Sequence, residues 1–365
     1  MNFFAYRLPG ASEPVMFEAE EASPVSFSAG RPGFIVAPFS PDDPSRFYAL
    51  RTPLASFPHS LEASFQAFPS ITTSTTPTTL TTPTLTTSTT STTPTTTLHS
   101  VNQGDYAAYI SEIKRRLGGR EDWKIVASRR EVCPLSAPPS MIFTRLCRAY
   151  PEAFVFFFSS PDFGAWIGAS PELLLEKRGP VLHTMALAGT RPASSPDAEF
   201  PRPWDQKNIL EQRIVTDSIV SAFEAQGLSC RVAAPRTLRA GTVEHIMTAI
   251  EAQLHPCASL PGLLRDLSPT PALAGFPRDL ALKTIAEFEG DRLLYGGYCG
   301  PVDASGDFRL SVILRCALLS PAAEGPETAP PSAVLFAGGG ITARSSASEE
   351  WRETSAKLST LRPHL

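Results

Sequence analysis

The 365-residue chain lacks the features that mark membrane proteins and nucleic-acid-binding proteins. No window approaches 18 uncharged apolar residues, and the N-terminal "MNFFAYRLPG" lacks the cationic and apolar segments of a secretory signal. The net charge is −4 and no cluster of Lys and Arg occurs, which argues against nucleic acid or an anionic membrane as a partner. These absences predict a cytoplasmic globular protein that acts on a small molecule.

Cysteine is scarce and irregularly spaced. There is no C-x-x-C pair and no histidine at a spacing that suggests zinc, so neither a disulfide framework nor a metal knuckle is indicated. We expect reduced, mostly buried thiols at Cys133, Cys147, Cys230, Cys257, Cys299 and Cys316.

Charge and aromatic residues are absent altogether from residues 71–98, "ITTSTTPTTLTTPTLTTSTTSTTPTTTL". Such a segment has too little apolar surface to offset the entropy lost on ordering, and it predicts a disordered insertion or linker. Residues 1–70 contain short alternating stretches such as "GFIVAPF", typical of strands, and we expect them to be a strand-rich part of the same domain. Residues 99–365 form the predicted catalytic region.

The rest of the chain alternates between strand and helix patterns without a strict βαβ order. Helical spacing is found at 105–117, 203–227, 278–290 and 345–361, and on the second of these the apolar stripe runs through Ile209, Ile214, Ile219 and Phe223. The pattern favours an α+β fold around large mixed or antiparallel sheets. Strands are predicted at 122–130, 153–159, 164–170, 172–177, 242–250, 307–320 and 332–341, the last two as neighbours.

Two charged side chains, Lys124 and Glu172, occur at positions where packing of the predicted strands does not require a charge. Lys124 opens the apolar run "KIVASR"; such a lysine most often lies at a strand edge with its amine in water, but a buried one can act as a base. Glu172 follows a Gly-Ala-Ser turn in "GASPELLLE", where a lone carboxylate is more often a turn residue. Pattern alone leaves both readings open.

Carboxylates on two predicted helices form a further group. Glu353 and Lys357 are spaced as an ordinary solvated i, i+4 pair. Together with Glu350 and with Glu211 on the earlier helix, Glu353 also offers the oxygen ligands that suit Mg²⁺. The Gly-rich stretches "LAGTRP" and "FAGGGIT" could bring backbone N–H groups to an anion, although neither matches a known phosphate-binding fingerprint.

From about Asp105 to the end, the chain resembles the chorismate-utilising enzymes. The resemblance is carried by ten blocks in the family order: "KIVASR", "GASPELLL", "LAGT", "KNILEQRIV", "VEHIMTAIEAQL", "PTPALAGFPR", "YGGYCGPVD", "LRCALL", "FAGGGI" and "EEWRETSAKLSTL". It implies a single large α+β domain in which two antiparallel sheets stack, flanked by helices, with the active site in a cleft.

The same resemblance implies the roles of individual residues. Glu211 and Glu353 are expected to bind Mg²⁺, and Glu350 to contact a metal-bound water. Lys357 and Arg315, with the backbone at Gly189 and Gly340, are expected to bind two substrate carboxylates. The remaining substrate pocket is expected to be formed by Thr190, His245, Ala272, Leu273 and Tyr295.

Lys124 bears on which member of the family this is. Ammonia-using members typically have Gln there, whereas water is a poor nucleophile and needs a base, so Lys124 indicates water as the nucleophile, with Glu172 as the acid that protonates the leaving 4-hydroxyl. Ala272 stands where pyruvate-releasing members tend to have Thr, which favours isochorismate as the product. We therefore expect a monomeric, Mg²⁺-dependent isochorismate synthase of menaquinone or siderophore biosynthesis, acting on chorismate without a glutamine amidotransferase subunit. A salicylate synthase and a catalytically silent chorismate-binding protein are the alternatives.

Three positions depart from the family pattern. Ser268 replaces a common His, which alters a polar contact, and Asn208 replaces a common Asp, which weakens the local negative charge. Gly339 gives "AGGG" for the usual "AGAG", and we expect this change to be harmless because glycine only loosens the backbone.

Overall fold

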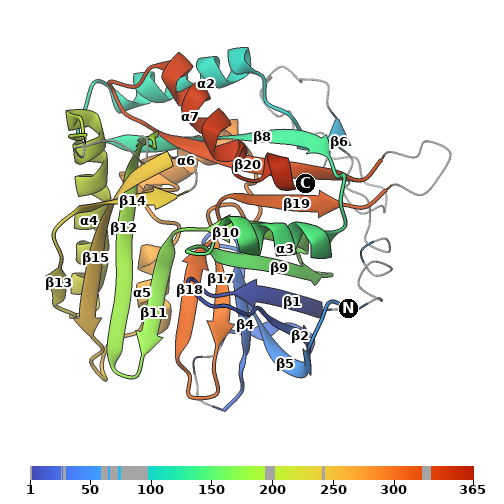
Figure 1. Ribbon diagram of the computed structural model, residues 1–365. Coiled ribbons are helices and arrows are strands. Elements are labelled where there is room, and N and C mark those ends of the chain that lie inside the picture. Colours follow the sequence, from blue (N-terminus) through green and yellow to red (C-terminus); the bar gives the residue numbers. More distant parts are fainter. Residues whose placement is uncertain are drawn as a thin grey trace, which may run out of the picture.

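A computed structural model describes residues 2–25, 27, 30–58, 65, 73–74, 98–193, 202–240, 243–322 and 330–365. Every strand pairing in its two large sheets is antiparallel. Helices cover the sheets, as Figure 1 shows, so the predicted antiparallel α+β fold is confirmed.

The first sheet contains the strand that begins at Lys124. Its order is β16 (Gly275–Phe276), β8 (Lys124–Pro134), β20 (Ser332–Ile341), β19 (Cys316–Ser320), β10 (Gly164–Ser170), β9 (Phe154–Ser160), β1 (Asn2–Arg7), β2 (Val15–Ala19) and β5 (Arg46–Leu54).

The second sheet shares strand β5 with the first, so the two sheets are continuous. From β5, which also pairs with β3 (Ser23–Pro24), the order is β4 (Gly33–Ala37), β17 (Tyr298–Val302), β18 (Phe308–Val312), β11 (Leu173–Arg178), β12 (Val181–Pro192) and β15 (Val243–Gln253). The far side of β15 pairs with β13 (Cys230–Val232) and β14 (Arg236–Ala240).

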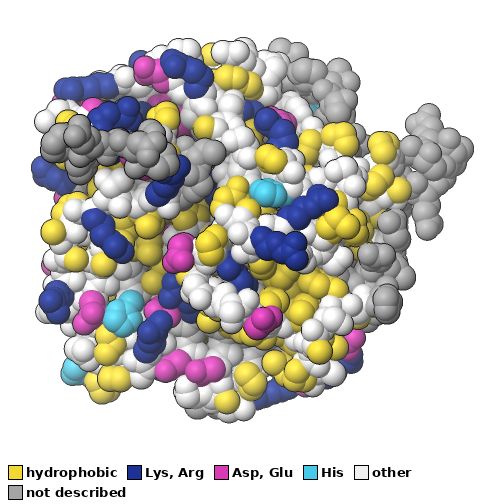
Figure 2. All heavy atoms as spheres, in the orientation of Figure 1, with side chains coloured by type: hydrophobic (Ala, Val, Ile, Leu, Met, Phe, Trp, Pro, Cys, Tyr) yellow, Lys and Arg dark blue, Asp and Glu magenta, His cyan; other side chains and the backbone are white. Residues whose placement is uncertain are grey.

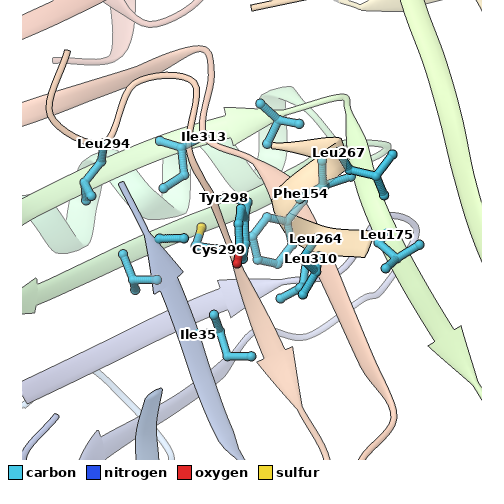
Figure 3. Packing of buried hydrophobic residues seen from close by; sticks show 14 of the residues in the cluster. Ile35, Phe154, Leu175, Leu264, Leu267, Leu294, Tyr298, Cys299, Leu310 and Ile313 are labelled. Atoms are coloured by element: carbon cyan, nitrogen blue, oxygen red, sulfur yellow. The ribbon is translucent and has the colours of Figure 1, made fainter. Parts of the chain in front are cut away.

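The main core lies between the inner faces of the two sheets. Figure 3 shows Phe154 of β9 packed close to Leu175, Leu310 and Ile35, which belong to strands of the second sheet. The next residue of β9, Val155, points the other way into a second core that also contains Phe143 of the overlying helix. Because β9 is covered on both sides, its "FVFFF" run is apolar without alternation.

The helices lie on the outer faces and at the ends of the sheets. In Figure 1, α2 (Gln103–Leu117) and α7 (Ala347–Leu358) lie above β8 and β20, α3 (Pro139–Ala149) covers β9 and β10, and α4 (Gln206–Ala225) runs beside β12 and β15. The sequence analysis did not predict α3, nor α5 (Leu260–Leu267), which packs on α4. Helix α6 (Arg278–Phe288) packs on β8, and the 3-10 turn η1 (Arg362–His364) follows α7.

Two local predictions are wrong. The run 307–320 is not one strand, because it breaks at residues 313–315 into β18 and β19, and only β19 neighbours β20. Ile209 does not belong to the buried stripe of α4, since it is 46% exposed. Asn208, Glu211 and Gln212 are buried in its place, so this end of the helix presents polar groups inward.

Most of the Thr-rich segment, residues 71–98, lies outside the described residues. Its predicted disorder therefore stays a prediction. Near its ends, β6 (Thr73–Ser74) pairs in parallel with β7 (Leu98–His99), so Thr73, Ser74 and Leu98 differ from that prediction. No helix in the described part of the chain is long and apolar enough to cross a bilayer. On the face shown in Figure 2, Lys and Arg side chains are interspersed with acidic and apolar ones.

Candidate active site

A cavity of about 570 Å³, including its open mouth, is bounded by β12, β15, β20, α4 and α7. Most of the predicted site residues line it, although they come from distant parts of the sequence: Glu172, Thr190, Glu211, His245, Ala272, Leu273, Tyr295, Arg315, Gly340 and Lys357. Pro171, Leu187, Ala188, Leu314, Phe336, Ala337 and Gly338 complete the wall.

Four predicted residues lie behind this wall rather than in it. Lys124 is paired with Glu211, Glu353 with Lys357, and the Gly189 carbonyl with His245. Glu350 lies against the backbone of β20 beside Gly339. Lys124, Glu353 and Gly189 therefore each contact a residue that lines the cavity.

Lys124 and Glu211 form a buried ion pair. Nζ lies 2.8 Å from Oε1, and the two side chains are 1% and 11% exposed. Burial alone would raise the pKa of Glu211, but the charges of Lys124 and Lys207 outweigh it, so that pKa is lowered. Both side chains press on Gly340, where a Cβ would overlap Glu211 Oε1. A side chain at this position would therefore displace the ends of both charged groups.

Helix α7 contributes two more carboxylates. Glu353 lies 2.7 Å from Lys357 Nζ, which also donates to the Gly338 carbonyl at 2.8 Å. Glu350 is paired with Lys207 of α4 at 2.7 Å. Burial and the charge of Glu353 raise the pKa of Glu350, and Lys207 opposes this shift. Because Lys357 lines the cavity and holds Glu353, the two do not form a solvated surface pair.

The three glutamates fit a divalent cation, although not as an all-protein cage. The described residues contain no group of three or more Asp, Glu, His or Cys side chains arranged as a metal cluster. Mg²⁺, however, commonly takes only one or two carboxylates and completes its shell with water and an anionic ligand. Glu350 Oε2 is buried and accepts no hydrogen bond from the described part of the chain. Such an oxygen is costly unless a cation or proton compensates it.

Glu172 lies in the cavity wall and is 4% exposed. Burial raises its pKa to about 8, even though Lys124 and a hydrogen bond from Thr270 Oγ1 act in the opposite direction. At neutral pH this carboxyl is therefore mostly protonated, so it can donate a proton into the cavity.

His245 has both ring nitrogens engaged by the protein. Nε2 faces Arg315 Nη2 at 3.1 Å, and because a guanidinium can only donate, Nε2 must accept. Nδ1 then carries the proton and donates to the Gly189 carbonyl at 3.2 Å, beside Thr190 Oγ1. Burial and the charge of Arg315 lower the pKa of His245 well below its ordinary value. This neutral ring holds Arg315 rather than exchanging protons with a ligand.

Arg315 occupies the break between β18 and β19. Its φ of +48° is a left-handed conformation that residues with a side chain rarely adopt. Its side chain is 5% exposed, and burial lowers its pKa. No carboxylate of the described residues lies within ion-pair distance of it. A buried cation without a counter-ion, facing a cavity, is suited to an anionic ligand.

The three departures from the family pattern have structural consequences. Asn208 donates to Asp205 Oδ2 at 2.7 Å and accepts from the Thr190 N–H at 2.9 Å, and an ionised aspartate in its place could only accept. Gly339 does more than loosen the backbone, because a Cβ there would lie 2.6 Å from Glu350 Oε2. Ser268 ends α5 and its carbonyl accepts from Arg278.

Sequence reasoning missed several polar neighbours of the site. Lys207 is the first residue of the "KNILEQRIV" block, and the proximity of a lysine to a predicted metal glutamate was an available signal. Thr270 of "PTPALAG" donates to Glu172. Thr360, just beyond α7, accepts from Arg315, and nothing in the sequence indicated that contact.

The antiparallel two-sheet fold thus places two cationic side chains and a buried carboxyl in one cavity, an arrangement typical of enzymes that act on small molecules. The sequence profile described as chorismate binding enzyme matches residues 60–365, so the chain belongs to that family.

Curated relatives carry related names. The chain is 34% identical over 229 residues to "Isochorismate synthase EntC" of Escherichia coli K12, covering 60% of this chain and 56% of that protein. It is 32% identical over 253 residues to "Putative isochorismate synthase MenF" of Mycobacterium tuberculosis H37Rv, covering 65% and 66%. The match to "Salicylate biosynthesis isochorismate synthase" of Pseudomonas aeruginosa is 34% over 251 residues, covering 66% and 50%. The chain thus spans about half to two thirds of these relatives.

Solved structures share the fold. The menaquinone-specific isochorismate synthase MenF of Escherichia coli superposes with a TM-score of 0.74 at 22% identity, over 100% of this chain and 89% of that one. The putative 2,3-dihydroxybenzoate-specific isochorismate synthase DhbC of Bacillus anthracis gives 0.73 at 22% identity, over 100% and 95%.

Proposed function

We propose that this protein is an isochorismate synthase that converts chorismate to isochorismate with the help of Mg²⁺. The observation that carries the proposal is Glu172, a buried carboxyl facing the cavity with a pKa raised to about 8. An acid that stays protonated at neutral pH is what departure of a hydroxyl group requires. The relatives named as isochorismate synthases support the same assignment.

The cations of the cavity account for substrate binding. Chorismate is a dicarboxylate, and Arg315 and Lys357 both line the wall. Arg315 has no carboxylate partner among the described residues, so one substrate carboxylate is its natural counter-ion. Lys357 reaches the second carboxylate from α7.

Water is activated by Lys124 in this scheme. As water attacks ring carbon 2, Lys124 Nζ accepts its proton, the ring double bonds shift, and the 4-hydroxyl leaves as water with the proton of Glu172. One water is consumed and one released, so the product is an isomer of the substrate. The role of base requires an uncharged amine, and Glu211 must therefore give up Lys124 as its partner in the working enzyme.

Glu211 and Glu353 would hold the cation, with Glu350 Oε2 directed at its water shell. Bound there, Mg²⁺ would neutralise a substrate carboxylate and support the developing negative charge.

The position of Lys124 supports water rather than ammonia as the nucleophile, so the protein would act without an amidotransferase subunit. We propose that it works as a monomer in the cytoplasm. Its product would enter menaquinone or siderophore biosynthesis, since relatives of both kinds occur.

The test is a chromatographic assay of the purified protein with chorismate, with and without Mg²⁺. Isochorismate that appears only with Mg²⁺ supports the proposal. Salicylate and pyruvate formed without an added lyase would indicate a salicylate synthase, and no turnover would indicate a silent chorismate-binding protein. The last two results each overturn the proposal.

A further inference from the structure

We propose that Thr360 is a positioning residue that, with Tyr150, aims Arg315 at a carboxylate of the substrate. This inference rests on the proposed function and concerns the same cavity. Neither residue lines the cavity, and the sequence analysis assigned a role to neither, although Thr360 lies near the end of the block "EEWRETSAKLSTL".

The guanidinium of Arg315 is oriented by hydrogen bonds to residues from other parts of the chain. The residue follows the end of β18, in a left-handed conformation. Its guanidinium has five N–H donors, and the described residues accept two of them: His245 Nε2 from Nη2 at 3.1 Å and Thr360 Oγ1 from Nη1 at 3.0 Å. The group is thus held between two acceptors, and donors remain for a ligand.

Both acceptors are uncharged. His245 is neutral in this environment, and a threonine hydroxyl carries no charge. A carboxylate in either place would neutralise Arg315 and compete with a substrate carboxylate. Neutral acceptors fix the orientation of the cation and leave its full charge for the ligand, which is preorganisation of a binding group.

Thr360 is itself fixed from two elements. Its N–H donates to the Lys357 carbonyl at 3.2 Å in the turn that ends α7, and its carbonyl accepts from Tyr150 Oη at 2.7 Å. Tyr150 is the residue that ends α3. Thr360 therefore joins the support of Arg315 to the helix turn that carries Lys357, so the two carboxylate-binding cations are positioned by one turn.

The experiment compares Thr360→Val, Thr360→Ser and Thr284→Val in steady-state assays with chorismate. Valine keeps the volume of threonine and removes the acceptor, while serine keeps the hydroxyl. Thr284 is the matched control, since it is also buried and also accepts from an arginine, Arg116, but lies on α6 outside the cavity wall.

We expect Thr360→Val to raise KM about ten-fold with kcat changed by less than about three-fold, the size expected for one hydrogen bond to a charged group. Thr360→Ser should restore a KM near that of the wild type. Thr284→Val should leave KM unchanged even if it lowers Tm as much as Thr360→Val does. Tyr150→Phe should raise KM by a smaller factor.

The dependence on Arg315 is tested in an Arg315→Gln background. There Thr360→Val should add no further increase in KM, because the group it positions is gone. An active wild type with an unchanged KM in Thr360→Val, or additive effects in the double variant, would overturn the inference. A wild type without isochorismate synthase activity would instead overturn the proposed function.

Discussion

Glu172 and Asn208 show how neighbours set the properties of single residues in this protein. The same carboxyl that would be ionised in water is kept protonated at Glu172 by burial. Asn208 donates a hydrogen bond to Asp205, which an ionised aspartate in the same place could not do. Both properties depend on contacts that no pattern in the sequence displays.

The rate should therefore fall as pH rises through about 8, the pKa of Glu172, because the acid form is lost. Glu172→Gln should lower kcat by a factor on the order of 10² to 10⁴ and abolish this alkaline limb. A wild-type rate that stays level from pH 7 to 9.5 would argue against Glu172 as the acid.

The same residue predicts a stability change that needs no substrate. Since the pKa of Glu172 rises on folding from 4.5 to about 8, the folded state retains a proton that the unfolded state releases, and stability falls between these pH values. Glu172→Gln should remove this loss, because glutamine does not titrate. In urea denaturation, the free energy of unfolding of the variant minus that of the wild type should therefore be more positive at pH 9 than at pH 4.5. An equal difference at both pH values would contradict the assignment.

Asn208→Asp should destabilise the protein by about 1–2 kcal/mol at pH 7, because it places a carboxylate 2.7 Å from where Asp205 Oδ2 now accepts a hydrogen bond. The swap Asp205→Asn with Asn208→Asp should recover most of the loss, since it restores one donor and one acceptor and Asn also caps helices well. Urea denaturation measures both. Equal stability of the single variant and the wild type would show that the pair is unimportant.

At the scale of elements, the helices and strands with a regular apolar pattern were predicted from the sequence. The interruption between β18 and β19, which places Arg315 at the cavity, was not. β20 and α7 were predicted closely, because "SAVLFAGGGI" and the spacing in "EEWRETSAKL" are regular. The break after β18 was not predicted, because the residues on both sides of Arg315 are apolar and continue the strand pattern. The left-handed backbone of Arg315 accompanies a tertiary contact, in which the Ala169 N–H donates to the Arg315 carbonyl. On α4, Ile209 is exposed because the polar residues beside it face the site.

The helices α4 and α7 are predicted to act together on Mg²⁺. Glu211→Gln and Glu353→Gln keep side-chain size and remove a charge, so each should raise the Mg²⁺ concentration for half-maximal activity by about ten-fold or more and weaken Mg²⁺ binding in calorimetry. Glu349→Gln is the control, because Glu349 is exposed on the same helix. Wild-type Mg²⁺ binding in both glutamine variants would remove these residues from the metal site.

At the scale of the whole molecule, two continuous sheets bring Lys124, Glu172, Arg315 and Lys357 to one place. Hydrophobic periodicity predicts strands but not which distant strands become neighbours, and the ordered family blocks were needed to group these residues before the structure was known.

The Thr-rich segment should be dispensable for folding. The short strands near its ends, β6 and β7, already pair with each other, so a brief Gly/Ser linker in place of residues 75–97 would join neighbouring points. Loop closure entropy changes slowly with length, so Tm should shift by no more than a few degrees. Failure of this variant to fold would show that the segment contributes to the structure.

The central claim, that water attacks the ring and the original hydroxyl leaves, is tested most directly by running the reaction in H₂¹⁸O and analysing the product by mass spectrometry. Lys124 as base and Glu172 as acid predict isochorismate that carries one ¹⁸O in its ring hydroxyl after a single turnover. Unlabelled isochorismate would mean that the hydroxyl group migrates without exchange, and would contradict the roles assigned to both residues.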